Sequence, residues 1–189
     1  MGLRRRRSWL WRATVPAAAL LTVAIAIAVG AASAPASPAA EPSAPAVAVA
    51  TPYPYETASR LGPWGFPTRH ATDYVAWRFF ERDVELSSAM RGPNGRTGRF
   101  GDAQSWAANA AHIGFRVDTV PAAGSIAHWN GGEAGAGGAG HVAYVDRVNA
   151  DGSVVISEFD SSVKYGYSQR GQQGTPAVRA PRYIHVADR

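Results

Sequence analysis

The sequence contains no cysteine among its 189 residues. This excludes disulfide bonds, so the stability of the protein has to come from its packed core, and it excludes a catalytic thiol anywhere in the chain. Internal repeats are also missing. The length is that expected for one domain of ordinary size preceded by a targeting segment.

Acidic residues are absent from the first 34 positions, which hold five arginines. All 14 acidic residues follow, and the basic residues that remain number 19 − 5 = 14, so the net charge of +5 belongs entirely to the N-terminal segment. The rest of the chain is neutral and has no excess of basic residues with which to bind a polyanion. Nucleic acid is therefore excluded as a predicted partner.

Residues 1–34 have the three parts of an export signal: an arginine cluster, an uncharged run over 13–30 and the small residues Ala-Ser-Ala at 32–34. They predict a signal peptide that is cleaved after Ala34. Because the uncharged run reaches the length of roughly 18 residues at which an apolar segment can span a bilayer, an uncleaved membrane anchor is the alternative. The protein is thus expected to be exported, or else anchored by this segment.

Residues 35–54 consist almost entirely of Ala, Pro, Ser and Val. Such a segment buries too little apolar surface to offset the entropy of ordering it, and its prolines favour an extended chain. It is predicted to be a linker, and residues 55–189 to be the folded domain.

Two helices are predicted in the first half of this domain. Apolar residues recur at three- and four-residue spacing over residues 69–82, with Thr68 as the expected N-cap. A second helix is expected from Asp102, as its N-cap, through Ala111. Trp77 and Trp106 fall among apolar neighbours on these helices and are therefore expected in the core.

After Pro121 the pattern changes to alternation, which indicates strands. Strands are expected over residues 125–129, 141–148, 153–159 and 182–186, with a glycine-rich loop over 131–140 and a hairpin turn over 149–152. Helices followed by an antiparallel sheet make an α+β fold.

Two motifs lie within these elements: TRHATDYVAWR at residues 68–78 and GHVAYV at residues 140–145. Together with segments at 101–106, 121–125 and 183–186 they resemble the CHAP domain, the papain-like cysteine and histidine-dependent amidohydrolase/peptidase module that cuts bacterial wall peptides. The resemblance covers nearly all of residues 55–187. It implies a papain-like α+β fold with N-terminal helices packed on an antiparallel sheet.

The resemblance also assigns roles to positions. Ala71 stands where the family has its nucleophilic cysteine, His141 matches the general base, and Glu158 matches the residue that orients the imidazole. A methyl group has neither a lone pair nor an ionisable proton, so covalent catalysis through residue 71 is excluded. Within a helix each step turns a side chain by about 100°, so His70 and Thr72 are expected to point away from this site.

Trp64 and Trp129 stand beside a turn and a glycine-rich loop, and they are predicted, together with His128, to bind substrate. We expect neither a cofactor nor a metal. The resemblance implies a protein that is secreted or associated with the cell wall, with the stem peptides of peptidoglycan or a cell-wall protein as its partners.

Three hypotheses of function stay open. The first is an exported, catalytically inactive relative of peptidoglycan amidases and endopeptidases that binds wall peptides or a partner protein. The second is a slow peptidoglycan hydrolase in which His141 acts with water or with a metal ion, for which His128 and Glu158 are further candidate ligands. The third is an exported structural protein.

Overall fold

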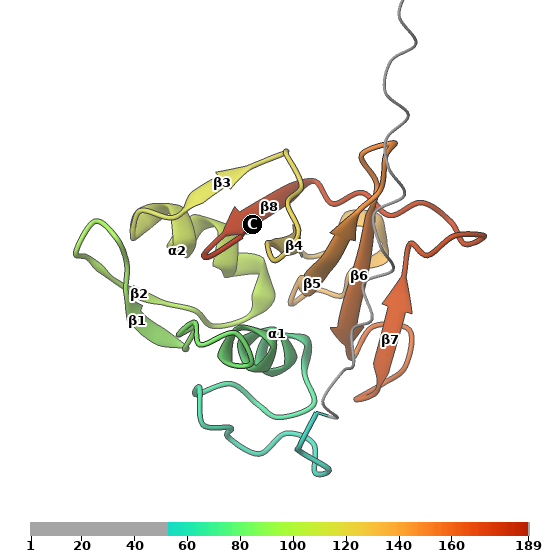
Figure 1. Ribbon diagram of the computed structural model, residues 1–189. Coiled ribbons are helices and arrows are strands. Elements are labelled where there is room, and N and C mark those ends of the chain that lie inside the picture. Colours follow the sequence, from blue (N-terminus) through green and yellow to red (C-terminus); the bar gives the residue numbers. More distant parts are fainter. Residues whose placement is uncertain (1–52, 189) are drawn as a thin grey trace, which may run out of the picture. The chain divides into compact units, whose positions relative to one another are not determined.

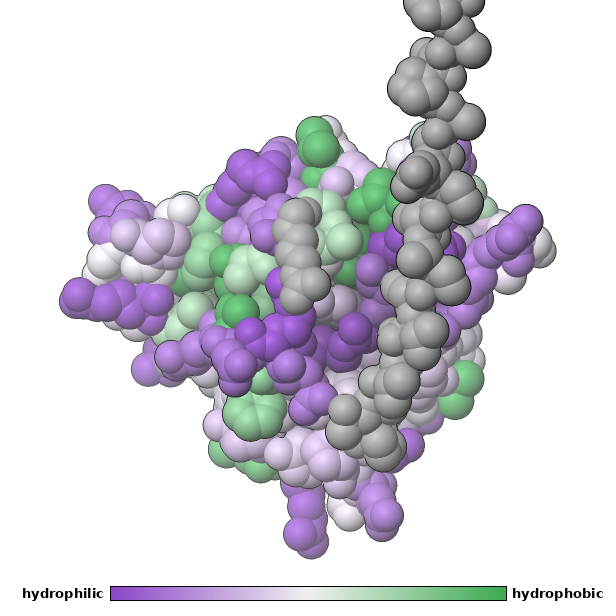
Figure 2. Space-filling model, viewed as in Figure 1, coloured by the Kyte–Doolittle hydropathy of each residue, from purple (hydrophilic) through white to green (hydrophobic). Residues whose placement is uncertain are grey.

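The computed structural model describes residues 53–188 (Figure 1). The predicted signal peptide or anchor, and the linker up to residue 52, lie outside the described residues. Within the described part no helix combines the length and apolar character needed to cross a bilayer. Hydrophilic residues form a broad band across the face shown in Figure 2, with smaller hydrophobic patches around it.

Helix α1 spans Ala71–Phe80 and is shorter than the predicted 69–82 at both ends. It begins late because Arg69 has a φ of 61° and His70 is extended, at φ −99° and ψ 161°, so neither residue has helical geometry. Thr68 is not the N-cap. Its hydroxyl donates to the carbonyl oxygen of Thr57 at 2.6 Å instead, and His70 takes the N-cap position.

The second helix forms where it was predicted, but its first turn is a 3₁₀ helix. This turn, η1, spans Ala103–Ser105, and α2 follows over Trp106–His112. The side chain of Trp106 is fully buried and its Nε1 donates to the carbonyl oxygen of Gly101 at 3.0 Å. Trp77 is also buried, so the prediction that both tryptophans belong to the core is confirmed.

The strands form one six-stranded antiparallel sheet, in the order β3-β8-β4-β5-β6-β7, and a separate antiparallel pair, β1-β2. Figure 1 shows β5, β6 and β7 on one side of the domain and β3, β8 and α2 on the other, with α1 below them. The strands span Ala89–Arg91 (β1), Thr97–Arg99 (β2), Arg116–Asp118 (β3), Ile126–Trp129 (β4), His141–Val148 (β5), Val154–Phe159 (β6), Tyr167–Arg170 (β7) and Arg182–His185 (β8). The predicted α+β class is confirmed.

The four predicted strands match β4, β5, β6 and β8 to within one residue at each end. The other four were not predicted: β1, β2 and β3 have only three residues each, too few to show a period of two, and β7 has four. β3 and β7 are the two edge strands of the six-stranded sheet, so each pairs with only one neighbouring strand. The glycine-rich loop also contains a single 3₁₀ turn, η2, over Glu133–Gly135.

The core lies on both faces of the sheet, and alternate residues of β5 separate the two parts. Val142 and Tyr144 pack with the buried residues of α1 and α2. Ala143 and Val145 belong to a second cluster, made of strand residues and the loop before β8. This alternation follows from the period of two in a β-strand.

An ion pair links α1 to β5. Arg78 Nη1 lies 2.8 Å from Asp146 Oδ1, and both side chains are largely buried. The guanidinium carbon of Arg78 also lies 4.1 Å from the centre of the Tyr144 ring, a cation–π contact. Burial raises the pKa of Asp146, and the charge of Arg78 opposes that rise. The register of β5 with β6 shifts at this position, between Val145 and Arg147.

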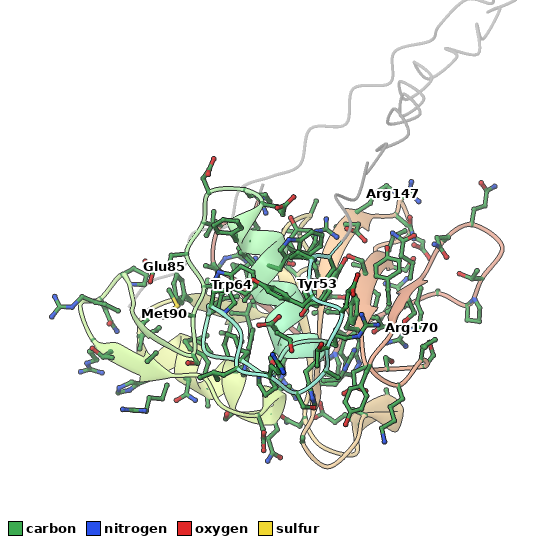
Figure 3. The ribbon with its side chains drawn as sticks, turned by 90° about the horizontal axis from the view of Figure 1, so that it is seen from below. Tyr53, Trp64, Glu85, Met90, Arg147 and Arg170 are labelled. Atoms are coloured by element: carbon green, nitrogen blue, oxygen red, sulfur yellow. The ribbon has the colours of Figure 1, made fainter. Side chains whose placement is uncertain are left out.

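The first described residue, Tyr53, packs on α1 (Figure 3). Its hydroxyl donates to Asp73 Oδ2 and accepts from the backbone N–H of Arg69 at 2.8 Å, and its ring meets the Trp77 ring edge-on at 5.5 Å between centres. Asp73 is fully buried, and its Oδ1 has no hydrogen-bond partner among residues 53–188. Burial raises the pKa of Asp73 to about 6, although the hydroxyl of Tyr53 opposes the rise.

This raised pKa predicts how Asp73 contributes to stability. The native state holds the proton more tightly than the unfolded chain, whose pKa is near 3.8, so the contribution is full below pH 4 and lost as the pH rises through about 6. Asp73→Asn cannot titrate and should be more stable than the natural chain above pH 6, by up to about 3 kcal/mol, because each unit of pKa shift corresponds to about 1.36 kcal/mol.

Urea unfolding of both proteins between pH 4 and pH 8 measures this difference. The matched control is Asp83→Asn, because Asp83 is exposed just beyond the same helix. A stability difference between Asp73→Asn and the natural chain that does not change with pH would contradict the prediction.

Candidate functional site

His141 is the first residue of β5 and is held in place by the glycine before it. Gly140 has a φ of +76°, a conformation that side chains disfavour, and a Cβ there would lie only 2.5 Å from the backbone nitrogen of Gln104. The same Gln104 N–H donates to the carbonyl oxygen of Ala139 at 2.8 Å. The glycine therefore lets the loop close tightly against η1 and directs His141 into β5.

The carboxylate of Glu158, on β6, accepts four hydrogen bonds. His141 Nε2 lies 2.8 Å from Glu158 Oε2, and Arg170 of β7 donates from Nε to Oε1 at 2.7 Å and from Nη2 to Oε2 at 2.9 Å. Ser168 Oγ adds a fourth bond to Oε1 at 3.2 Å. Burial alone would raise the pKa of Glu158, but the bonds from His141 and Arg170 outweigh it and lower the pKa to about 2. Glu158 is thus a fixed negative charge.

Arg170 and Ser168 are the residues of this site that the sequence interpretation missed. They stand two positions apart on β7 and so share one face of the strand, with Ser168 directly opposite Glu158 in the register. The sequence signal for this strand was the polar pair Ser168 and Arg170 at a spacing of two, within a segment of only four residues. Figure 3 shows Arg170 on this edge strand of the sheet.

The two ring nitrogens of His141 have different surroundings. Nε2 is engaged by Glu158, which leaves Nδ1 as the nitrogen available for proton transfer. Nδ1 makes no hydrogen bond to the residues that the structure describes, and it is not among their buried unpartnered atoms. An imidazole oriented by a carboxylate through one nitrogen can act as a base through the other.

Ala71 and His141 line the same cavity, which has a volume of about 400 Å³. Ala71 is the first residue of α1, so this wall of the cavity is a helix N-terminus with backbone N–H groups free of helical partners. The other lining residues come from the first turn of α1, from η1 and from the loops around them: Gly65, Phe66, Pro67, His70, Thr72, Phe100, Gly101, Asp102, Ala103, Ala139, Gly140 and Asp160.

The prediction that His70 and Thr72 point away from this site is wrong, since both line the cavity. The rotation of 100° per residue holds only inside a helix, and His70 lies outside it with an extended backbone. Thr72 is in the first turn, where three successive residues border the opening.

Trp129 lies beside His141 and lines a second cavity of about 280 Å³. The centres of the two rings are 5.8 Å apart, and the guanidinium of Arg170 lies 5.7 Å from the centre of the Trp129 ring. The second cavity shares Ala139, Gly140, His141 and Asp160 with the first. The two cavities therefore adjoin at His141, with Ala71 in one and Trp129 in the other.

Trp64 and His128 lie elsewhere, unlike the groove positions expected for them. Trp64 borders a different, mainly apolar cavity next to Phe80, with 5.6 Å between the ring centres. His128 is fully buried, with Nε2 2.9 Å from the carbonyl oxygen of Ala103 and Nδ1 3.2 Å from Arg182 Nη1. Its strand, β4, is paired on both edges, by β8 and β5, and all four of its residues are buried. Burial lowers the pKa of His128 and favours its neutral form.

The set of metal ligands considered above, His128 with His141 and Glu158, does not assemble. His128 makes the contacts just given, whereas His141 and Glu158 face each other. Across residues 53–188, no group of three or more histidine, aspartate or glutamate side chains is arranged to hold a metal ion.

Removing Glu158 tests how strongly this network supports the fold. Glu158→Ala leaves the buried His141 and the partly exposed Arg170 guanidinium without their shared acceptor, which should destabilise the protein by about 1 to 3 kcal/mol. Thermal or urea unfolding at pH 7 measures the loss. Glu56→Ala is the matched control, because Glu56 is exposed. Equal stabilities of the two variants would show that the network contributes nothing to folding.

The chain is similar to several bacterial cell-wall proteins. It is 34% identical over 110 residues to the "Probable autolysin SsaALP" of Staphylococcus aureus, a match covering 58% of this chain and 37% of the relative. It is 33% identical over 109 residues to the N-acetylmuramoyl-L-alanine amidase sle1 of Staphylococcus haemolyticus, covering 58% of this chain and 30% of the relative. The chain thus matches about a third of the length of these proteins.

A solved structure has the same fold. The N-acetylmuramoyl-L-alanine amidase of Staphylococcus aureus superposes with a TM-score of 0.52 at 27% identity, over 71% of this chain and 34% of that one. The profile of the CHAP domain matches residues 62–160, which is more than half of the chain and includes α1, β5 and β6. On this match, with the fold and the motifs around residues 71 and 141, the chain belongs to the CHAP domain family.

Proposed function

We propose that this protein is an exported CHAP-domain protein of the cell envelope that binds peptidoglycan peptides, or a wall protein, without cleaving them through residue 71. The observation that carries the proposal is Ala71 on the wall of the cavity that His141 also lines, in a sequence without cysteine. An alanine methyl cannot attack a carbonyl group, whereas a groove needs only shape and hydrogen-bonding groups to bind a ligand.

Export and the wall as its destination are supported by the relatives and by the N-terminal residues. Similar proteins carry the names autolysin, N-acetylmuramoyl-L-alanine amidase and, at 43% identity over 68 residues, staphylococcal secretory antigen ssaA2. Residues 1–34 have the pattern of a signal peptide. An uncleaved anchor made by the same residues is the alternative.

The ligand in this proposal occupies the two adjoining cavities. In this view His141, ordered by Glu158, and Ala71 are the positions of the base, the orienting residue and the missing nucleophile. The ring of Trp129 and the polar groups of Asp102 and Asp160 offer apolar and hydrogen-bonding contacts to a peptide. A chain running past His141 would contact both cavities at once.

A second candidate function is slow hydrolysis, in which His141 activates a water molecule. The free Nδ1 of an imidazole oriented by Glu158 favours it. This candidate predicts that soluble muropeptides are released from isolated walls at a rate that His141→Ala abolishes, and that result would overturn the proposal of an inactive binding module. Sensitivity of the release to a chelator would separate a metal-dependent reaction from one that uses water alone.

Retention on walls tests binding. The natural chain should sediment with insoluble peptidoglycan, and Ala139→Trp should reduce the retained fraction at least tenfold, because Ala139 is exposed on the wall that both cavities share. Ala150→Trp is the matched control, placed in the exposed turn between β5 and β6. No retention of the natural chain would favour a structural role instead.

Introducing a cysteine at residue 71 tests whether this is the position of the family's nucleophile. Ala71→Cys places a thiol at the N-terminus of α1, where the helix dipole favours a thiolate. The variant should release muropeptides from purified walls, and Ala71→Ser should do so far more slowly, since a hydroxyl is the weaker nucleophile. An Ala71→Cys protein that folds and binds walls but releases nothing would show that more than the nucleophile is missing.

A further inference from the structure

Three side chains beside the first cavity form a relay that the His141–Glu158 pair does not use. Ser59 Oγ lies 3.1 Å from His70 Nε2, and His70 Nδ1 lies 3.3 Å from Asp160 Oδ2. With the proton on Nδ1 facing the carboxylate, Nε2 accepts the proton of the serine hydroxyl. This is the relation of a nucleophile to a base and of the base to an orienting acid.

Asp160 and the imidazole are both held in place by Tyr165. The backbone N–H of Tyr165 donates to Asp160 Oδ1 at 2.9 Å, which leaves Oδ2 toward His70. The ring of Tyr165 packs against the imidazole, with 5.1 Å between the ring centres. The orientation of His70 is therefore determined from two sides.

The loop that carries Ser59 is fastened to Thr68, which is almost fully buried. Ser59 donates its N–H to the carbonyl oxygen of Thr68 at 2.9 Å, and Arg60 donates its N–H to Thr68 Oγ1 at 3.2 Å. Thr68 directly precedes the segment that leads into His70. The serine hydroxyl and the imidazole are thus positioned by one short stretch of chain.

Backbone strain is concentrated at this relay. Of the six described non-glycine residues with positive φ, four belong to it or contact it: Ser59 at 60°, Arg69 at 61°, Asp160 at 54° and Tyr165 at 51°. Arg69 joins the others by donating from Nε to the carbonyl oxygen of Tyr165 at 2.8 Å. Such conformations are unfavourable and cluster at functional sites, where surrounding contacts maintain them.

A substrate can reach all three groups. Ser59 is exposed, and the side chains of His70 and Asp160 are 32% and 25% exposed. His70 and Asp160 also line the cavity of about 400 Å³, so a substrate that reaches this cavity lies beside the imidazole and the carboxylate.

From this geometry we propose that Ser59, His70 and Asp160 form a serine-type acyl-transfer site that hydrolyses carboxylic esters or amides. Ser59 Oγ attacks the carbonyl carbon and forms a C–O bond while its proton passes to His70 Nε2. The bond to the leaving alcohol or amine then breaks, and the leaving group takes that proton. Water, deprotonated by His70, hydrolyses the acyl-serine, releases the acid and restores Ser59. Asp160 is the positioning residue.

This site does not rest on the wall-binding proposal. The serine reaction needs neither His141 nor affinity for peptidoglycan, so either proposal can fail while the other stands. Two readouts separate them: retention on peptidoglycan reports the wall-binding groove, and labelling of Ser59 reports the serine reaction.

A fluorophosphonate probe, which reacts with activated serines, tests the site on the full chain. Peptide mass spectrometry should find the probe on Ser59, and His70→Gln should reduce its incorporation at least tenfold. Ser162→Ala is the matched control, because Ser162 is exposed on the loop that follows Asp160 and should leave labelling at Ser59 intact. No labelling, labelling of other residues alone, or labelling of Ser59 that does not depend on His70 would overturn the proposal.

Hydrolysis of p-nitrophenyl acetate gives the second measurement. Ser59→Ala should lower kcat at least tenfold, and it removes only an exposed hydroxyl, so unfolding curves that match the natural chain will show that the fold is kept. Asp160→Asn should lower kcat with KM unchanged, and Asp160→Glu should restore part of it. Equal kcat values for Ser59→Ala, Ser162→Ala and the natural chain would show that Ser59 is not the nucleophile.

Discussion

The packing of α1 against β5 and β6 is the constraint on which both candidate sites depend. Arg78 makes it specific, because its charge pairs with Asp146 and its guanidinium covers the ring of Tyr144. With the helix in this place, its N-terminus borders the start of β5 and the end of β6. Ala71, His141 and Asp160 meet around one cavity for this reason, although the chain separates the first from the last by almost ninety positions.

The two histidines at this cavity are held by different means. His141 is nearly buried, and its partner Glu158 is kept ionised by Arg170 as well as by His141 itself. His70 is partly exposed and lies between a serine hydroxyl and a carboxylate at the entrance to α1. A buried imidazole fixed by a charged network suits a rigid groove, whereas an accessible one beside a hydroxyl suits proton transfer to and from a substrate.

The sequence predicted the long elements and the positions with a motif. β5 and β6 could be predicted because they have eight and six residues and are bounded by a glycine-rich loop and a hairpin turn, and their hairpin placed Glu158 near His141. The short edge strand β7 carried no such pattern, so the two bonds from Arg170 to Glu158 were missed. Trp64 and His128 were predicted to bind substrate, but Trp64 borders another cavity and His128 is buried in a central strand of the sheet.

What the sequence by itself determined is the chemistry that is absent and the class of fold: no thiol occurs at residue 71 or anywhere else, and helices precede an antiparallel sheet. The tertiary structure alone decided which polar groups share a cavity. Ser59, His70 and Asp160 come from a loop, a helix N-cap and the end of a strand, where backbone angles with positive φ or extended geometry aim side chains in directions that no helical or strand period predicts.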